Sequence, residues 1–441
     1  MGEAHPNTLD AMIGLALANA KAGKLAKANS LYSKTVELGE TKLGHKHPTT
    51  LRYKTQFYLH LVEFGSNPDI SVTELLAILD KQIGVLGEHH PNVASTMNTL
   101  GVILQNTGQF KKSIPHFRKS VAISEEVLGL DHPDTLTRIS NLSAAQRSVG
   151  RVNESIAGLE TVLKKLEDLL GLRHSRTLDC ANSLAQSYQA RGHNKKAIRL
   201  FERILNASQE TVGDDHPTTT IFVSNLASAY FENRQPKKAI PLFELALKTN
   251  KETIGPDHPN TLKIMSFLAK CYLVSGDPIQ ALELYKSTEK LQRQVLGQSD
   301  FAYLYTLSGL ADTYRVNKKF EDAIEHYQAA IKGQIQLLGE GHPHTLQSYH
   351  GLAKAFEQVN NLHEAIVIAE KTVELITARM GEKHPNTLIC EAELADLFAK
   401  NNRLKDAIHL LRINLNKRRE VFGSAHELTV QIQSQLAALE K

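Results

Sequence analysis

The chain has 441 residues with three cysteines, and its 51 basic and 47 acidic residues give a formal net charge of +4 at pH 7. Charges this close to balance offer no strong attraction to nucleic acid or to an anionic membrane, so the composition argues against both partners. The cysteines are too few for a disulfide framework, and the sequence has neither an apolar run of about 18 residues nor the basic start of a signal peptide. These features predict a cytoplasmic protein.

The dominant feature of the sequence is a link of the form Gly-x-x-His-Pro-x-Thr-Leu that returns every 42 residues, with one step of 43. Its anchor position is occupied by His5, His47, His90, His132, His174, His216, His258, Asp300, His342, His384 and His426. A unit of this length cannot bury its apolar face alone, so neighbouring units must stack on one another. The period therefore predicts a solenoid of repeats.

The unit that begins at His216 illustrates how each repeat is expected to fold. Pro217 occupies the first position of a helix, and apolar residues at helical spacing extend this helix to the segment before Asn233. The apolar pattern resumes at Ala239 and predicts a second helix that ends at Gly255. A glycine recurs at this closing position in ten units, which indicates a left-handed helix cap.

The turn between the two helices of a unit varies more than the closing glycine. It carries glycine in six units and Arg234, Lys318, Asn360 or Asn402 in the others. Because asparagine tolerates positive φ, we expect a left-handed turn at the two asparagines, whereas Arg234 and Lys318 predict a relaxed geometry. One extra residue, in the segment 65–69, predicts a local bulge in the second unit.

The order of small and large residues resembles the tetratricopeptide repeat. The matching positions are Leu226, Ala227, Tyr230, Ala239, Phe243 and Ala246. The 42-residue link resembles that of kinesin light chains and of arrays attached to bacterial signalling proteins such as Ser/Thr kinases and NTPase regulators. The chain lacks the heptad coiled coil that kinesin light chains place before their repeats, which argues against a motor-adaptor role.

The resemblance implies an all-α fold, a right-handed superhelical α-solenoid of about ten 42-residue helix-turn-helix repeats with a terminal helix. The whole chain, 1–441, then forms a single repeat array. Its units are expected at 5–46, 47–89, 90–131, 132–173, 174–215, 216–257, 258–299, 300–341, 342–383 and 384–425, followed by a capping helix at 426–441.

No motif in the sequence indicates covalent chemistry, because phosphate-binding glycine loops, nucleophile elbows and zinc-protease signatures are all missing. The anchor histidines recur about 10 Å apart, one per repeat, which is too far for them to share a metal ion. We expect their imidazoles to bond the backbone of the link instead. We interpret Cys180, Cys271 and Cys390 as small core residues. The sequence thus predicts no enzymatic activity, no cofactor and no metal site.

The resemblance also implies that positions of the first helix of each unit line an inner face. The residues predicted to bind there are Asn98, Asn141, Arg147, Asn182, Gln186, Asn225, Lys270, Arg315 and Lys354. Short amides can bond the backbone of an extended peptide, and cations favour acidic ligands. Later units add the apolar residues Phe231, Phe267, Leu273 and Tyr305. The alternative is that the asparagines bond neighbouring helices and the cations are solvated.

Two functions remain open at this stage. The first is a non-catalytic scaffold or adaptor that binds a peptide or protein segment in the concave groove of the first helices. The second is the regulatory or sensory region of a larger bacterial signalling protein, a Ser/Thr kinase or NTPase regulator, with its catalytic domain outside this chain. A third hypothesis is self-association through the N-terminal edge, where Met12, Ile13, Leu15 and Leu17 have no preceding unit to cover them.

Overall fold

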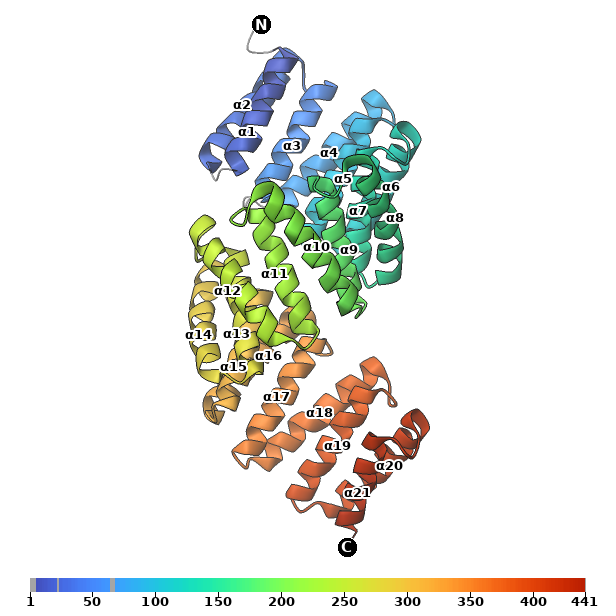
Figure 1. Cartoon of the computed structure of the whole chain (residues 1–441), viewed down its shortest axis with the longest axis vertical. Helices are drawn as coiled ribbons and strands as arrows, with labels where there is room; N and C mark the ends of the chain where they lie inside the picture. Colours follow the sequence, from blue (N-terminus) through green and yellow to red (C-terminus); the bar gives the residue numbers. More distant parts are fainter. Residues whose placement is uncertain (1–4, 22–23, 64–67, 441) are drawn as a thin grey trace. The chain divides into compact units, whose positions relative to one another are not determined.

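The computed structural model describes residues 5–21, 24–63 and 68–440, and this part of the chain contains α-helices joined by short links and no strand (Figure 1). The helices are α1 (Pro6–Lys21), α2 (Leu25–Lys42), α3 (Pro48–Glu63), α4 (Pro68–Leu86), α5 (Pro91–Asn106), α6 (Phe110–Leu128), α7 (Pro133–Ser148), α8 (Val152–Leu170), α9 (Ser175–Ala190), α10 (Asn194–Val212), α11 (Pro217–Glu232), α12 (Pro236–Thr253), α13 (Pro259–Ser275), α14 (Pro278–Val295), α15 (Phe301–Val316), α16 (Phe320–Leu338), α17 (Pro343–Gln358), α18 (Leu362–Met380), α19 (Pro385–Lys400), α20 (Leu404–Phe422) and α21 (Glu427–Leu439). We call the odd-numbered helices, which follow an anchor residue, A helices and the even-numbered ones B helices.

The helices form two compact units, residues 1–225 and 226–441, and the division falls within α11. In each unit, helices that follow one another in the chain pack side by side (Figure 1). Several A helices also contact the next A helix, as α3 contacts α5 and α13 contacts α15. Packing between neighbours is the arrangement of an α-solenoid of helix-turn-helix repeats, so the predicted fold class is confirmed.

Each A helix begins directly after its anchor residue, which acts as the N-cap. At every one of the anchors, a side-chain acceptor receives a hydrogen bond from the backbone N–H two residues later. Nδ1 of His90 accepts from the amide of Asn92 at 3.1 Å, and the carboxylate of Asp300 accepts from Ala302 at 2.7 Å. The predicted role of the histidines in the link is confirmed, and Asp300 fits because aspartate is a preferred N-cap.

Six of the glycines that close B helices are C-caps with a conformation different from the predicted one. Gly129 has φ 88° and ψ 163°, and Gly381 has φ 93° and ψ 159°. The positive φ was expected, but its combination with these ψ values lies outside the left-handed helical region. Essentially only glycine adopts this combination of φ and ψ. This geometry explains why glycine closes these six B helices, whereas other residues replace glycine at the A-to-B turn.

The A-to-B turn keeps positive φ in units that lack glycine there. Arg234 and Lys318 have φ values of 59° and 60°, and Asn360 and Asn402 have 58°. The predicted relaxed turn at Arg234 and Lys318 was therefore wrong, because packing of the two helices imposes left-handed geometry at a cost of about 1–2 kcal/mol for a residue with a Cβ. Of the bulge predicted at 65–69, residues 65–67 lie outside the described residues, so the prediction stays untested.

Small residues allow A and B helices to approach closely. A Cβ placed on Gly351 of α17 would lie 2.4 Å from the ring of Tyr327, a residue of α16 that is only 1% exposed. Gly309 of α15 stands in the same relation to Tyr285 of α14, with 2.5 Å to the ring. Both glycines occupy the ninth position after their anchors, so the tyrosine rings fill the room that a side chain would need.

The cores of both units consist mainly of aliphatic and aromatic side chains. Leu226, Ala227, Phe243 and Ala246, which carry the repeat pattern, are all buried. Ile13 is also buried in the first unit, while Leu15 and Leu17 are exposed. Within the described residues, no helix combines the length and the apolar composition that crossing a bilayer requires.

Candidate functional site

The four predicted asparagines form two pairs on the A helices of residues 1–225. Nδ2 of Asn141 on α7 donates to Oδ1 of Asn98 on α5 at 3.0 Å. Nδ2 of Asn225 on α11 donates to Oδ1 of Asn182 on α9 at 2.8 Å. In each pair one residue is eight and the other nine positions after its anchor, so each pair joins the A helices of adjacent repeats. The asparagines thus bond neighbouring helices, which was the alternative role.

Each pair nevertheless leaves hydrogen-bonding groups for a ligand. All four side chains are half-buried. Each pair uses one N–H and one carbonyl of its two amides, so each keeps a free carbonyl oxygen on one amide and a free NH₂ group on the other, for which the described residues provide no partner. One donor and one acceptor side by side match the N–H and C=O groups of an extended peptide.

Arg147 and Gln186 flank these pairs. Nη1 of Arg147 donates to the backbone oxygen of Ser183 at 3.0 Å and lies 3.5 Å from Oγ of Ser187, so the guanidinium ties α7 to α9. Burial lowers the pKa of Arg147. Gln186 is half-buried on α9 and has no hydrogen bond within the described part of the chain. Of these two predicted groove residues, Gln186 keeps the larger share of its polar groups for a ligand.

In the compact unit of residues 226–441, Lys270 lies among aromatic side chains. Its Nζ donates to the hydroxyl of Tyr305 at 2.8 Å, and it lies 5.2 Å and 5.8 Å from the ring centres of Tyr305 and Phe231. Tyr305 contacts Phe267 and, edge-on, His344. Lys270 and Tyr305 line a cavity of about 190 Å³ on α13, α15 and α17. The apolar residues predicted for later units therefore cluster around a cation.

Arg315 belongs to a more buried polar group. It lies 3.9 Å from the carboxylate of Asp312, which also accepts a hydrogen bond from the hydroxyl of Tyr327. Nε of Arg315 is buried and has no partner among the described residues. Burial, together with the charge of Asp312, raises the pKa of Tyr327, so this hydroxyl stays protonated and donates. These contacts join α15 to α16, and they leave Arg315 next to the carboxylate of Asp312.

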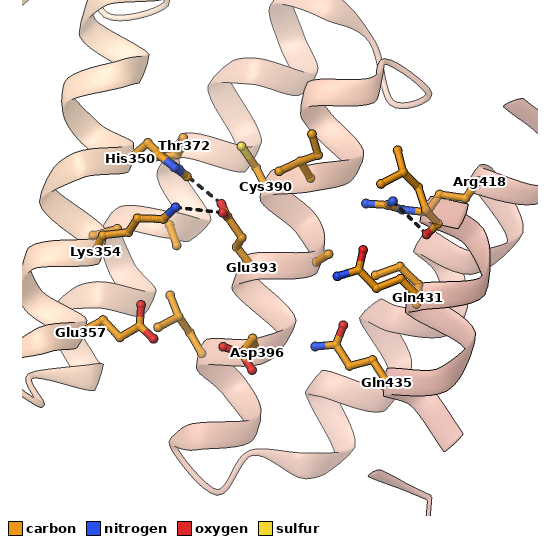
Figure 2. A pocket seen from close by; sticks show the side chains of 17 residues that line it. His350, Lys354, Glu357, Thr372, Cys390, Glu393, Asp396, Arg418, Gln431 and Gln435 are labelled. Atoms are coloured by element: carbon orange, nitrogen blue, oxygen red, sulfur yellow. Dashed lines mark hydrogen bonds and ion pairs between the residues drawn. The ribbon is translucent and has the colours of Figure 1, made fainter. Parts of the chain in front are cut away.

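A cavity of about 390 Å³ lies beside Lys354, one of the predicted residues (Figure 2). It is lined mostly by the A helices α17, α19 and α21, with Ala369 and Thr372 from α18 and Arg418 from α20. The labelled lining residues in Figure 2 are His350, Lys354, Glu357, Thr372, Cys390, Glu393, Asp396, Arg418, Gln431 and Gln435.

Glu393 is the central charged residue of this cavity. Its Oε1 lies 3.2 Å from Nζ of Lys354, and its Oε2 lies 3.3 Å from Nδ1 of His350 (Figure 2). His350 and Glu393 occupy the eighth and ninth positions after their anchors, the same relation as in the asparagine pairs. Burial lowers the pKa of His350, with the charge of Glu393 acting in the opposite direction. The cavity thus repeats the pairing between adjacent repeats seen in residues 1–225, here with an imidazole and a carboxylate.

The rim of the cavity carries further paired charges. Nζ of Lys400 lies 2.6 Å from Glu357 and 2.5 Å from Asp396. Hydrogen bonds to these two carboxylates raise the pKa of Lys400. The amides of Gln431 and Gln435 on α21 make no hydrogen bond within the described residues and remain available to a ligand.

Cys390 differs from the other two cysteines. Cys180 and Cys271 are buried, as predicted, but Cys390 is half-buried and lines the cavity. Burial raises the pKa of its thiol to about 11. The interpretation of Cys390 as a core residue was therefore wrong, because the cavity exposes one side of α19 at this position. The sequence signal was its place three residues before Glu393, since both then share one helix face.

Models of the tetratricopeptide repeat match residues 217–294 and 303–378, and a second model of the same repeat matches residues 93–134 and 177–218. Together these matches span more than half of the chain. The chain therefore belongs to the tetratricopeptide repeat family, as the spacing of its small and large residues predicted.

Several solved structures are similar to this chain. A Podosopora anserina protein with nearly identical TPR-like repeats, assigned as a kinesin light chain, is 27% identical over 46% of this chain and 96% of its own, with a TM-score of 0.40. The apo form of the quorum sensor NprR from B. thuringiensis is 16% identical over 84% of this chain and 99% of its own, with a TM-score of 0.59. A Rap protein complexed with Competence and Sporulation Factor is 13% identical over 82% of this chain and 100% of its own, with a TM-score of 0.50. No curated protein sequence matches this chain significantly.

Proposed function

We propose that this chain is a non-catalytic scaffold that binds an extended peptide or protein segment along the face formed by its A helices. The observation that carries the proposal is the pairing of Asn98 with Asn141 and of Asn182 with Asn225. The pairs fix the orientation of half-buried amides and leave each pair one donor side and one acceptor side for a ligand backbone. Such a surface recognises a main chain with little demand on its sequence.

The cations on the A helices of residues 226–441 favour an acidic ligand. Lys270 has no carboxylate partner among the described residues, and its neighbours are the aromatic rings of Phe231 and Tyr305. Arg315 and Lys354, by contrast, each lie close to a carboxylate of the chain itself. Lys270 is therefore the residue that we expect to attract an acidic side chain, with the rings offering an apolar surface beside it.

The proteins of similar fold are compatible with this function. The Rap protein was solved in complex with Competence and Sporulation Factor, and NprR is described as a quorum sensor. Their likeness to this chain establishes the fold alone, so the ligand of this chain has to be found by experiment.

The proposal is tested by selecting peptide ligands from a displayed library on the full chain and measuring their affinity for variants. Asn141→Ala combined with Asn182→Ala removes one amide from each pair and should weaken binding about 5–150-fold, or about 1–3 kcal/mol. Asn206→Ala is the matched control, because Asn206 is an exposed asparagine in the middle of the B helix α10. Unchanged affinity in the double variant, or failure of the library to yield any ligand, would contradict the proposal.

A further inference from the structure

Three potential metal ligands of different chemistry converge at the edge of the cavity on α17 and α19. Nitrogen of His350, sulfur of Cys390 and a carboxylate oxygen of Glu393 all lie within 4.8 Å of one another. Figure 2 shows the three side chains around one space, with His350 on α17 facing Glu393 and Cys390 on α19. All three side chains are half-buried, so the space between them is partly shielded from solvent but open to it.

The spacing of these atoms is close to that of a tetrahedral site. Bonds of about 2.0–2.3 Å from zinc to nitrogen, oxygen and sulfur place the ligand atoms about 3.3–3.8 Å from one another. Nδ1 of His350 and Oε2 of Glu393 already lie 3.3 Å apart. The other ligand atoms, which lie up to 4.8 Å apart, have to approach one another by about 1 Å to reach the spacing of a tetrahedral site. Rotation of the half-buried side chains supplies this shift.

We propose that His350, Cys390 and Glu393 form a binding site for a divalent transition-metal ion, with Zn²⁺ as the ion that fits the donor set best. Imidazole, thiolate and carboxylate are the three ligand types that zinc takes in proteins, whereas calcium and magnesium prefer oxygen alone. A thiolate and a carboxylate together balance the two charges of the ion. The site binds the ion independently of any peptide ligand.

The surroundings of the three residues suit this role. Nζ of Lys354 contacts Oε1 of Glu393 and leaves Oε2, the oxygen facing His350, for the ion. Metal-ligating carboxylates are commonly held by such a hydrogen bond on the other oxygen. Cys390 makes no hydrogen bond within the described residues, so no existing bond to its sulfur has to be broken.

The site also has an entry path and a free coordination position. His350 and Cys390 line both the cavity of about 390 Å³ and a second cavity of about 270 Å³ on α17, α18 and α19. Three protein ligands leave a fourth tetrahedral position, which water from the larger cavity can occupy.

This proposal departs from the sequence-based prediction of no metal site. That prediction rested on the spacing of the anchor histidines, on the absence of zinc motifs and on the interpretation of the three cysteines as core residues. The Nδ1 atoms of the anchor histidines are indeed engaged in N-caps. His350 is not an anchor and caps no helix, and its partners are 40 and 43 residues away in the sequence. The packing of α17 against α19 brings together ligands that no local motif joins.

Titration of the metal-free full chain with Co²⁺ tests the proposal. Co²⁺ adopts zinc-like tetrahedral geometry and absorbs visible light there, and a cysteine ligand adds a charge-transfer band in the near ultraviolet. We expect saturation at about one equivalent of Co²⁺ with both signals, and loss of both when Zn²⁺ replaces it, because zinc binds such sites more tightly than cobalt. Absence of saturable binding would overturn the proposal.

Variants identify the ligands. Cys390→Ser should abolish the charge-transfer band, and His350→Gln or Glu393→Gln should weaken Co²⁺ binding at least about tenfold. The matched control is Cys180→Ser, because Cys180 lies six positions after its anchor, as Cys390 does, but belongs to no ligand cluster in the described chain. Circular dichroism confirms that each variant keeps its helices. Equal Co²⁺ binding by wild type and the three ligand variants, or loss of binding in Cys180→Ser alone, would contradict the assignment.

Discussion

The pairing of Asn98 with Asn141 makes a quantitative prediction for local stability. Removing one partner breaks a hydrogen bond of 3.0 Å between α5 and α7 and leaves the other amide half-buried. A net hydrogen bond contributes about 0.5–1.5 kcal/mol, and partial exposure places this one at about 0.5–1 kcal/mol, because water compensates part of the loss. Asn98→Ala and Asn141→Ala should each cost about this much, and the double variant should cost less than their sum.

Native-state hydrogen exchange is the suitable assay, because a repeat array opens locally and a single global unfolding free energy is not well defined. We expect exchange in α5 and α7 to accelerate about 2–5-fold in each single variant, while α19 and α20 keep their rates. A coupling free energy of zero between the two substitutions would refute the pairing. Because the hydrogen bond joins two helices, loss of either asparagine should affect local stability as well as ligand binding.

The structure makes further predictions about packing, backbone geometry and pH. Leu411 is fully buried with Ile432 and Leu436, so Leu411→Ala should cost about 2–5 kcal/mol and accelerate exchange in α19–α21 more than in α13; equal acceleration everywhere would contradict packing between neighbours. Gly381→Ala should lower the free energy of unfolding by about 1–3 kcal/mol, because alanine fits the backbone conformation of Gly381 poorly. Lys318→Gly should stabilise its hairpin by about 0.5–1 kcal/mol, because glycine adopts positive φ without strain. Thermal unfolding that ranks the two variants in the opposite order would rule out the assigned conformations. Burial lowers the pKa of His116 below its ordinary value of 6.5, so its contribution to stability is present above pH 6.5 and is lost as pH falls below it. His116→Gln should therefore lose less stability than wild type between pH 7 and pH 5, and an identical decline in both proteins would show that His116 has no part in it.

Local chemistry made much of the fold predictable from the sequence. The anchor histidines and the closing glycines recur because each performs a task within a few residues, capping an A helix or adopting a positive φ. The turn at Lys318 escaped prediction because its φ is imposed by the packing of two helices rather than by the residue itself.

The candidate site was less predictable, because its contacts join residues of different repeats. The asparagines could be placed on the A helices from their spacing, but the alternation of eighth and ninth positions that allows them to pair becomes meaningful only when adjacent helices are seen together. The same holds for His350 and Glu393, whose side chains lie 3.3 Å apart although the residues are 43 positions apart in the sequence. The exposure of Cys390 depends on a cavity, and no sequence pattern records a cavity.

Photo-crosslinking of a selected peptide to the full chain shows directly whether the ligand lies on the face formed by the A helices. A photoreactive amino acid replaces Gln186 on the A helix α9 in one variant and Arg199, an exposed residue on the B helix α10, in another. We expect efficient crosslinking from position 186 and little from position 199, and unlabelled peptide should compete with crosslinking at position 186. Equal yields from both positions, or crosslinking from position 199 alone, would contradict this expectation.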